Sequence, residues 1–353
     1  MPPTGPGAEE ATVETGEAEN TAVKPSRTGI SVVICAHTDE RWEATLAAVE
    51  SVRNQTLPAA ETILVVDHNP ALQQRLASAL PDVLVTHNRE EQGLSGGRNT
   101  GIALAQSEVV AFLDDDAVAD PRWLEFLTDS YADPSVAGVG GLTLPKWQTR
   151  RPSWFPEEFG WVIGCAYRGM PTSRAPVRNL HGGNASFRRE VFSVVGGFRN
   201  GIGRSASKRP LGCEETEFCI RLGQHSPGSV LMFDNRAMIR HLVPAARCRF
   251  SYFRARCYAE GVSKAVVASM VGAGDGLSAE RHYTTRTLPG GIAAGLADFV
   301  RGHPAGLSRA AAIVAGLAAT MAGYLVGSLG RRPWQRGRSG VPPVPGLAPG
   351  SAR

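Results

Sequence analysis

The segment from Ile30 to about Val139 alternates short apolar runs with stretches that can form helices with one apolar face, and this alternation constrains the fold most strongly. The runs are rich in β-branched residues and apolar throughout, as strands buried on both faces of a sheet are. The predicted strands span residues 30–36, 62–67, 83–88 and 109–116. The predicted helices span residues 42–54, 70–80, 95–106 and 121–132. Strands that alternate with helices predict an α/β protein with a mostly parallel, doubly wound sheet flanked by helices.

The pattern after Leu144 is less regular. Residues 145–182 carry Trp147, Trp154 and Trp161 among prolines and favour no continuous helix. These indoles suit stacking on a sugar ring, a lipid interface or the cap of a core. The remaining predictions are a strand entering a helix at 184–195, a Gly- and Ser-rich loop at 196–212, helices at 214–223 and 250–270, and a short strand at 230–233.

Composition sets the boundaries of the globular part. Residues 1–28 carry hardly any large apolar side chains, and residues 331–353 are basic and rich in Pro and Gly, so both predict disordered tails. Between them we expect a globular domain at 29–265 and a helical C-terminal region at 266–330. The net charge of +4 is too small to indicate a nucleic-acid partner. The six cysteines form no Cys-x-x-Cys pair, and no signal peptide precedes the domain, so we expect reduced thiols in the cytoplasm.

Residues 310–329 contain no charge and approach the length needed to cross a bilayer. Four arginines follow between residues 331 and 338. If the globular domain is cytoplasmic and residues 310–329 cross the membrane once, these arginines lie on the outer side of the membrane. That arrangement opposes the positive-inside tendency, so a re-entrant, interfacial or hairpin arrangement at the inner face of the cell membrane fits better. The alternative is a helix of small residues that packs on the globular body and touches no membrane.

Polar residues follow several of the predicted strands. The first strand ends in Ala36-His37-Thr38-Asp39-Glu40, the second in Asp67, and the fourth in Asp114-Asp115-Asp116. The carboxyl ends of parallel strands share one edge of the sheet, where ligands bind in such folds. Adjacent carboxylates repel one another, and a hard divalent cation that bridges them to a phosphate would relieve the repulsion. His241 completes an Asp-plus-His metal site if the sheet returns it to this edge.

Two further segments bear on a ligand site. Gly93 to Asn99, with Gly97 and Arg98, joins a strand to a helix N-terminus, where small residues allow a ligand or another backbone to approach closely. Glu214, Glu215 and Glu217 open a helix, an arrangement that the helix dipole also favours without any catalytic role.

These motifs together resemble the family 2 glycosyltransferases, inverting enzymes of the GT-A fold, over about residues 29–265, which would then be the catalytic domain. The similar segments, in chain order, are SVVICAHTDE, LVVDHN, GLSGGRNTGI, AFLDDDAVADPRWL, GGNASFRREVFSVVGGF and GCEETEFCIRLG. A set of motifs in this order is specific for the family.

The resemblance implies a nucleotide-sugar donor, with uridine as the preferred base, and Mn²⁺ or Mg²⁺ as the cofactor. Residues in the place of the family's nucleotide-binding residues are Ala36, His37, Glu40, Asp67, Gly97, Arg98, Asp114 and Asp115. Asp116, with Asp114 and His241, would bind the metal, and Glu215 or its neighbour Glu214 would be the catalytic base. In the loop, Arg204, Lys208 and Arg209 are candidates to neutralise the departing nucleoside diphosphate.

The implied acceptor is a hydroxyl of a glycan, a lipid-linked saccharide or a small natural product. Two other functions compete with this interpretation. Asp114 to Val118 also fits the nucleophile strand of phosphoaspartyl phosphatases, although that motif belongs on the first strand of its sheet. A scaffold protein that binds a sugar nucleotide without turnover would keep the same fold.

Overall fold

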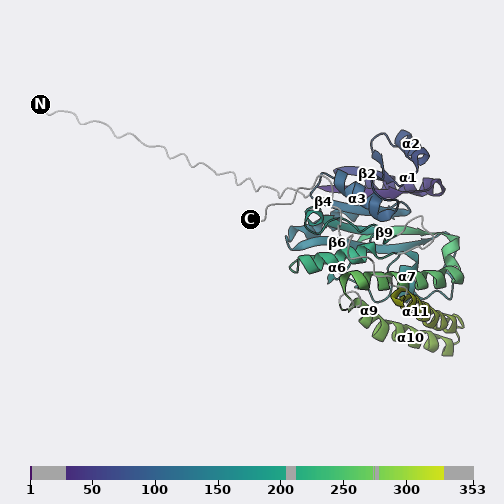
Figure 1. Ribbon diagram of the computed structural model, residues 1–353. Helices are drawn as coiled ribbons and strands as arrows, with labels where there is room; N and C mark the ends of the chain where they lie inside the picture. Colours follow the sequence, from purple (N-terminus) through teal and green to yellow (C-terminus); the bar gives the residue numbers. More distant parts are fainter. Residues whose placement is uncertain (2–28, 204–211, 273, 275–277, 330–353) are drawn as a thin grey trace.

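The computed structural model of the protein describes residues 1, 29–203, 212–272, 274 and 278–329 (Figure 1). Residues 2–28 and 331–353 of the two predicted tails, and residues 204–211 of the predicted loop, which include Arg204, Lys208 and Arg209, lie outside the described residues.

Nine strands form one mixed sheet in the order β3-β2-β1-β4-β8-β6-β9-β5, and β7 pairs with β9. The strands are β1 (Ile30–Ala36), β2 (Glu61–Val66), β3 (Leu84–His87), β4 (Val109–Asp114), β5 (Ala117–Ala119), β6 (Val136–Trp147), β7 (Ala175–Val177), β8 (Asn184–Arg188) and β9 (Val230–Val243). The predicted parallel arrangement is confirmed from β3 to β4, whereas β8 runs antiparallel to both of its neighbours. The sheet is therefore parallel over β1 to β4, which the periodic part of the sequence forms, and it is mixed over the strands that follow.

Helices cover both faces of this sheet. In the first two thirds of the chain they are α1 (Trp42–Arg53), α2 (Pro70–Ala79), α3 (Leu94–Leu104), α4 (Trp123–Asp129), α5 (Val191–Val195) and α6 (Glu214–His225), with short 3₁₀ turns η1 (Asp39–Arg41), η2 (Ser130–Ala132) and η3 (Glu157–Ile163). The C-terminal helices are η4 (Ala245–Cys248), α7 (Phe250–Val271), α9 (Ser278–His282), η5 (Tyr283–Thr287), α10 (Leu288–Val300) and α11 (Ala305–Leu329). The predicted boundary at residue 265 falls inside α7.

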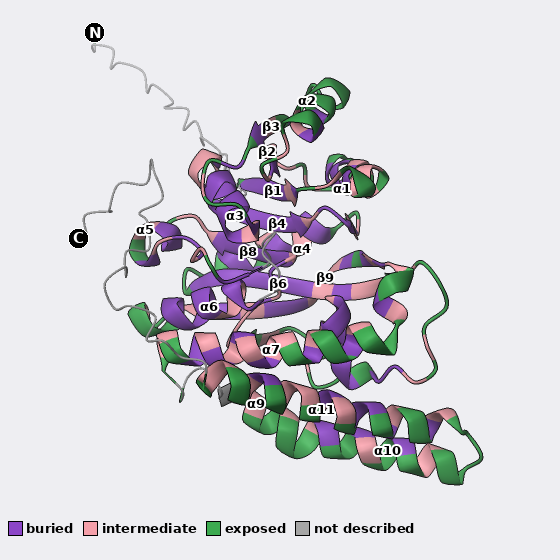
Figure 2. Cartoon of the chain, turned by 45° about the vertical axis from the view of Figure 1, so that its right-hand side comes forward, coloured by how far each residue is buried: buried purple, intermediate pink, exposed green. Residues whose placement is uncertain are grey.

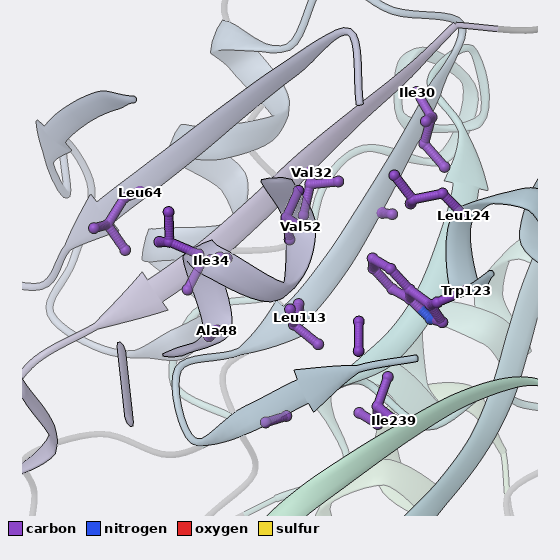
Figure 3. Packing of buried hydrophobic residues seen from close by; sticks show 14 of the residues in the cluster. Ile30, Val32, Ile34, Ala48, Val52, Leu64, Leu113, Trp123, Leu124 and Ile239 are labelled. Carbon is purple, nitrogen blue, oxygen red and sulfur yellow. The ribbon is translucent and has the colours of Figure 1, made fainter. Parts of the chain in front are cut away.

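Alternating side chains of the central strands build two cores. Val32 and Ile34 of β1 pack with α1, α2 and α4 around the fully buried Trp123 (Figure 3). Val33, between them in sequence, points to the opposite face and packs with residues of α3, α5 and α6. Both faces are therefore closed, and the carboxyl edge of β1, β2 and β4 is left as the place for a ligand.

One strand prediction is wrong in length, and strand β6 was not predicted. The strand predicted at 230–233 continues to Val243, because β9 pairs along its length with β6, with a register shift between Gly141 and Leu142. The region from Pro145 was predicted to be irregular, yet β6 continues through it to Trp147. Local sequence does not reveal either extension, because long-range pairing stabilises both segments.

The C-terminal helices form a layer against the sheet domain. α11 packs along α7 and beside α10, and α7 lies between these two helices and the sheet (Figure 2). Within the described residues, α11 is the one helix that is long and apolar enough to cross a membrane. It packs on the globular body and still exposes Val314, Met321 and Leu325, while α10 exposes Phe299 and Val300.

Glycines bring α7 and α11 into backbone contact. A Cβ atom on Gly323 would lie 2.0 Å from the carbonyl oxygen of Tyr258, so Gly323→Ala forces the helices apart. We expect this variant to lower the free energy of unfolding by about 1–3 kcal/mol, the usual cost of overpacking. Gly223→Ala in α6 is the matched control, because a Cβ there meets nothing within 4 Å and should stabilise the protein by about 0.5–1 kcal/mol. Thermal or urea unfolding measures both, and equal stability of the two variants would contradict the close helix contact.

Candidate active site

A cavity of about 520 Å³ lies at the carboxyl edge of β1, β2 and β4. Of the residues predicted for a ligand site, it is lined by Ala36, His37, Asp67, Gly97, Arg98, Asp114, Asp115, Glu214 and Glu215. Three predicted residues do not line the cavity: Glu40 is exposed on η1, and Asp116 and His241 are buried beside the cavity. Segments that are up to about 180 positions apart in the chain, from Ala36 to Glu215, therefore meet at the edge that the strand pattern indicated.

The three consecutive aspartates occupy different environments. Asp114 is the last residue of β4 and is partly exposed, while Asp115 and Asp116 are buried in the turn to β5. Arg41 Nη1 of η1 lies 2.6 Å from Asp115 Oδ1 and 3.1 Å from Asp116 Oδ2, so one guanidinium offsets much of the repulsion. The sequence analysis did not include Arg41 among the candidate site residues. Its position directly after the polar residues that follow β1 could have indicated that it lies at the same edge of the sheet.

The pKa values of the two buried carboxyls move in opposite directions. Burial raises the pKa of Asp115 to about 6, with the Arg41 charge working against that rise. Burial would raise the pKa of Asp116 too, but a hydrogen bond from His241 and the charges of His241, Arg41 and Arg247 hold it below its usual range. Asp116 therefore ionises more readily than an ordinary aspartate, as a ligand of a cation should.

His241 lies beside Asp116, with Nε2 3.1 Å from Oδ1. It is part of β9, paired with Ala117, and does not follow a short strand as predicted. Ligand atoms of Asp114, Asp116 and His241 all lie within 4.8 Å of one another, as a metal site requires. Oδ2 of Asp115 and Oδ2 of Asp116 are buried without a hydrogen bond from the described residues, although Arg41 Nη1 lies 3.1 Å from the Asp116 oxygen. Two carboxylates and an imidazole at these separations fit a divalent cation.

Arg98 is a buried counterion between the two groups of acids. Its guanidinium lies 3.0 Å from Glu214 Oε1 and 3.7 Å from Asp114 Oδ1, and the side chain is 3% exposed. Gly182 makes room for it, since a Cβ there would lie 2.9 Å from the guanidinium, and Gly183 likewise accommodates Asp114. Sequence reasoning placed Arg98 near the nucleotide but missed this link.

Glu215 differs from its neighbour. It is half-buried and forms no ion pair with any described residue, whereas Glu214 is engaged by Arg98. Burial, followed by the repulsion of the Glu214 carboxylate, raises the pKa of Glu215 to about 8, and the Arg98 charge opposes this shift. Cys213, directly before the pair, has φ of +73°, an uncommon conformation for a residue with a side chain. Such strain next to a carboxyl group with a perturbed pKa is typical of functional sites.

Asp67 follows β2 at the other end of the cavity. Its carboxylate accepts hydrogen bonds from Asn88 Nδ2 at 2.7 Å and from the Gly93 amide at 3.0 Å. These donors fix the side chain, and a carboxylate with about four lone-pair positions keeps capacity for a ligand N–H group.

The architecture matches that of a solved glycosyltransferase. The mannosyltransferase PcManGT from Pyrobaculum calidifontis, in complex with GDP-Man and Mn²⁺, superposes with a TM-score of 0.52 at 16% identity, covering 84% of this chain and 88% of that one. The mixed sheet with flanking helices is thus the GT-A glycosyltransferase fold.

Sequence comparison assigns the family. The model of glycosyl transferase family 2 matches residues 31–196. The glucosyl-dolichyl phosphate glucuronosyltransferase of Haloferax volcanii is 38% identical over 242 residues, which are 67% of this chain and 77% of that protein. The succinoglycan biosynthesis protein ExoM of Rhizobium meliloti is 24% identical over 240 residues, 66% of this chain and 72% of that protein. The chain belongs to glycosyl transferase family 2, and the protein is a glycosyltransferase. This membership speaks against the phosphatase interpretation.

Proposed function

We propose that the protein transfers a sugar, with inversion, from a nucleoside-diphosphate sugar to a hydroxyl of a lipid-linked saccharide. The observation that carries the proposal is Glu215, a carboxyl group of raised pKa without an ion-pair partner among the described residues, at the inner end of the acid-lined cavity. A general base needs a pKa near the working pH and freedom from a permanent counterion, and Glu214 lacks that freedom.

In the proposed reaction, ionised Glu215 accepts the proton of the acceptor hydroxyl as its oxygen bonds to the anomeric carbon. The bond from that carbon to the diphosphate oxygen breaks on the opposite side, and the electron pair leaves with the nucleoside diphosphate. One in-line displacement inverts the configuration. Arg98 keeps Glu214 and Asp114 in place in the wall of the cavity.

Mn²⁺ or Mg²⁺ held by Asp116, Asp114 and His241 would supply positive charge to the diphosphate. Asp67 suits a base with an N–H group at its pairing edge, such as uracil or guanine, because its free capacity is that of a hydrogen-bond acceptor. The family resemblance implies uridine, so we propose UDP as the nucleotide.

The lipid-linked acceptor is supported by two observations. The relative from Haloferax volcanii is named for a glucosyl-dolichyl phosphate acceptor. The α10–α11 pair exposes apolar side chains, among them Phe299, Val300 and Met321, that a bilayer surface would cover. We therefore place the enzyme in the cytoplasm, at the inner face of the cell membrane.

Nucleotide-dependent stabilisation tests the proposed donor site. Of UDP, GDP and dTDP, each with and without Mn²⁺ or Mg²⁺, UDP with a metal should raise the unfolding temperature most. A ligand at about 100 times its Kd adds roughly 2.7 kcal/mol of stability. If GDP raised the unfolding temperature most, only the proposed identity of the nucleotide base would be wrong. If no nucleotide changed the unfolding temperature of the folded protein, the proposed donor site would be wrong.

A further inference from the structure

A second cavity, of about 200 Å³, lies beyond Glu215. It shares Trp161, His181, Cys213, Glu215 and Arg256 with the first cavity. The rest of its wall comes largely from the C-terminal helices, including Lys264 of α7, Tyr283 of η5, and Leu317 and Thr320 of α11. The carboxyl group proposed as the base thus stands between two cavities, of which the second owes much of its wall to residues after 250.

An indole with a fixed orientation forms part of the shared wall. Trp161 Nε1 donates to Tyr283 Oη at 3.0 Å, and Tyr283 Oη donates to the carbonyl oxygen of Glu158 at 2.7 Å. Tyr167 packs edge-on against Tyr283, with ring centroids 5.6 Å apart. A flat aromatic surface that is already held in place loses little entropy when a ring packs on it.

The charges around this cavity balance one another. Glu260 faces Lys264 at 3.5 Å and Arg256 at 3.4 Å, while Glu280 faces Lys264 and, at 3.6 Å, Arg178. Once Glu215 is ionised, as the proposed base must be, three carboxylates face three cations, so a phosphate or carboxylate in this cavity would then meet as many like charges as opposite ones.

Two lining side chains nevertheless keep hydrogen-bonding capacity. Arg256 Nη1 and Glu280 Oε2 are buried atoms without a hydrogen-bond partner among the described residues, one a donor and the other an acceptor. A hydroxyl group both donates and accepts, so neighbouring hydroxyls satisfy both atoms. A fully ionised phosphate or carboxylate has no hydrogen to donate to the Glu280 carboxylate.

We infer that this second cavity binds a neutral pyranose ring of the acceptor, with the indole of Trp161 as its stacking surface and Arg256 and Glu280 as partners of its hydroxyl groups. The inference rests on the proposed function and deepens it. It makes the helices after residue 250 part of the acceptor site, and it assigns a lipid-borne phosphate to a position outside this cavity.

Saturation-transfer NMR on the full chain tests the inference, with the methyl glycosides of glucose, galactose and mannose as probes and methyl phosphate as the anionic alternative. At least one glycoside should bind, with and without UDP and Mn²⁺. Thr320→Phe fills the cavity from α11 and should abolish that signal, whereas Met321→Phe, one position along on the same helix and 57% exposed, should leave it unchanged.

Glu280→Gln, which adds no bulk, should weaken glycoside binding at least about fivefold by removing the charged acceptor. Binding of methyl phosphate that strengthens in Glu280→Gln would overturn the neutral sugar, and so would a protein that binds UDP but none of the glycosides. Glycoside binding that survives in Thr320→Phe would place the sugar elsewhere. Failure of UDP to bind, with glycoside binding intact, would overturn the donor site alone.

Discussion

Glu215→Gln is expected to lower the rate of sugar transfer by about 10²–10⁴-fold, the usual contribution of a general base. Glutamine keeps the shape of the side chain but cannot accept the proton of the acceptor hydroxyl. The Kd of the nucleotide should remain within about twofold of the wild-type value, because the acids next to the proposed diphosphate site are unchanged. Transfer assays with UDP-sugars and isothermal titration with UDP and Mn²⁺ measure the two quantities.

Glu214→Gln is the matched control. It adds the same amide one residue earlier, but it takes away a partner of the buried Arg98 guanidinium. We therefore expect it to lower thermal stability more than Glu215→Gln does. Equal loss of UDP binding and transfer in Glu215→Gln, or full transfer in that variant, would reject Glu215 as the base.

The raised pKa of Glu215 gives this prediction a dependence on pH. The base must be ionised, so kcat/KM of the wild-type enzyme should rise with pH until about 8. Stability should change in the opposite direction. Because the folded-state pKa of about 8 exceeds the pKa of about 4.5 that Glu215 has in the unfolded chain, the folded wild-type protein binds more protons than the unfolded chain between these pH values. Its stability falls as pH rises through that window, and Glu215→Gln should lack this loss.

Asp116→Asn is expected to weaken metal-dependent UDP binding by about 100-fold or more, because a charged ligand of the cation is lost and each tenfold change requires only about 1.4 kcal/mol. His241, Arg41 and Arg247 also lose the negative charge between them, so a lower unfolding temperature should accompany the effect. Titration of Mn²⁺ and UDP into the folded variant measures the loss.

Asp115→Asn provides the comparison. Asp115 lines the cavity at the carboxyl edge of the sheet but does not belong to the Asp114, Asp116 and His241 group. The metal dependence of UDP binding should survive in this variant. If both variants lost the metal effect to the same degree, or if neither did, the assignment of Asp116 as the principal ligand would be incorrect.

The parts of the fold that follow from local periodicity were predictable from the sequence. Helix α1 was predicted at 42–54 and spans Trp42–Arg53, and the strands β1 and β2 differ from their predictions by at most one residue at either end. Each of these elements carries its own apolar pattern, because the sheet buries both faces of its strands. The polar residues at their ends consequently indicated the correct edge of the sheet.

The remaining features depend on partners far away in the chain. Residues 234–243 are polar enough to look like a loop, and they form a strand because β6 lies beside them. Arg41 lies 74 positions before Asp115, so no local spacing in the sequence predicts their contact. The second cavity likewise needs η3, α7, η5 and α11 side by side, an arrangement that only tertiary packing fixes.

The position of Arg98 between Asp114 and Glu214 also has an evolutionary consequence. A single buried cation serves two acids from distant parts of the chain, so replacing Arg98 leaves two carboxylates without their counterion, and replacing either acid changes the charge that Arg98 meets. We expect the three positions to change together when related proteins diverge. Lineages that replace the arginine should show matching substitutions at both acids, and libraries that randomise one of these sites alone should yield few functional clones.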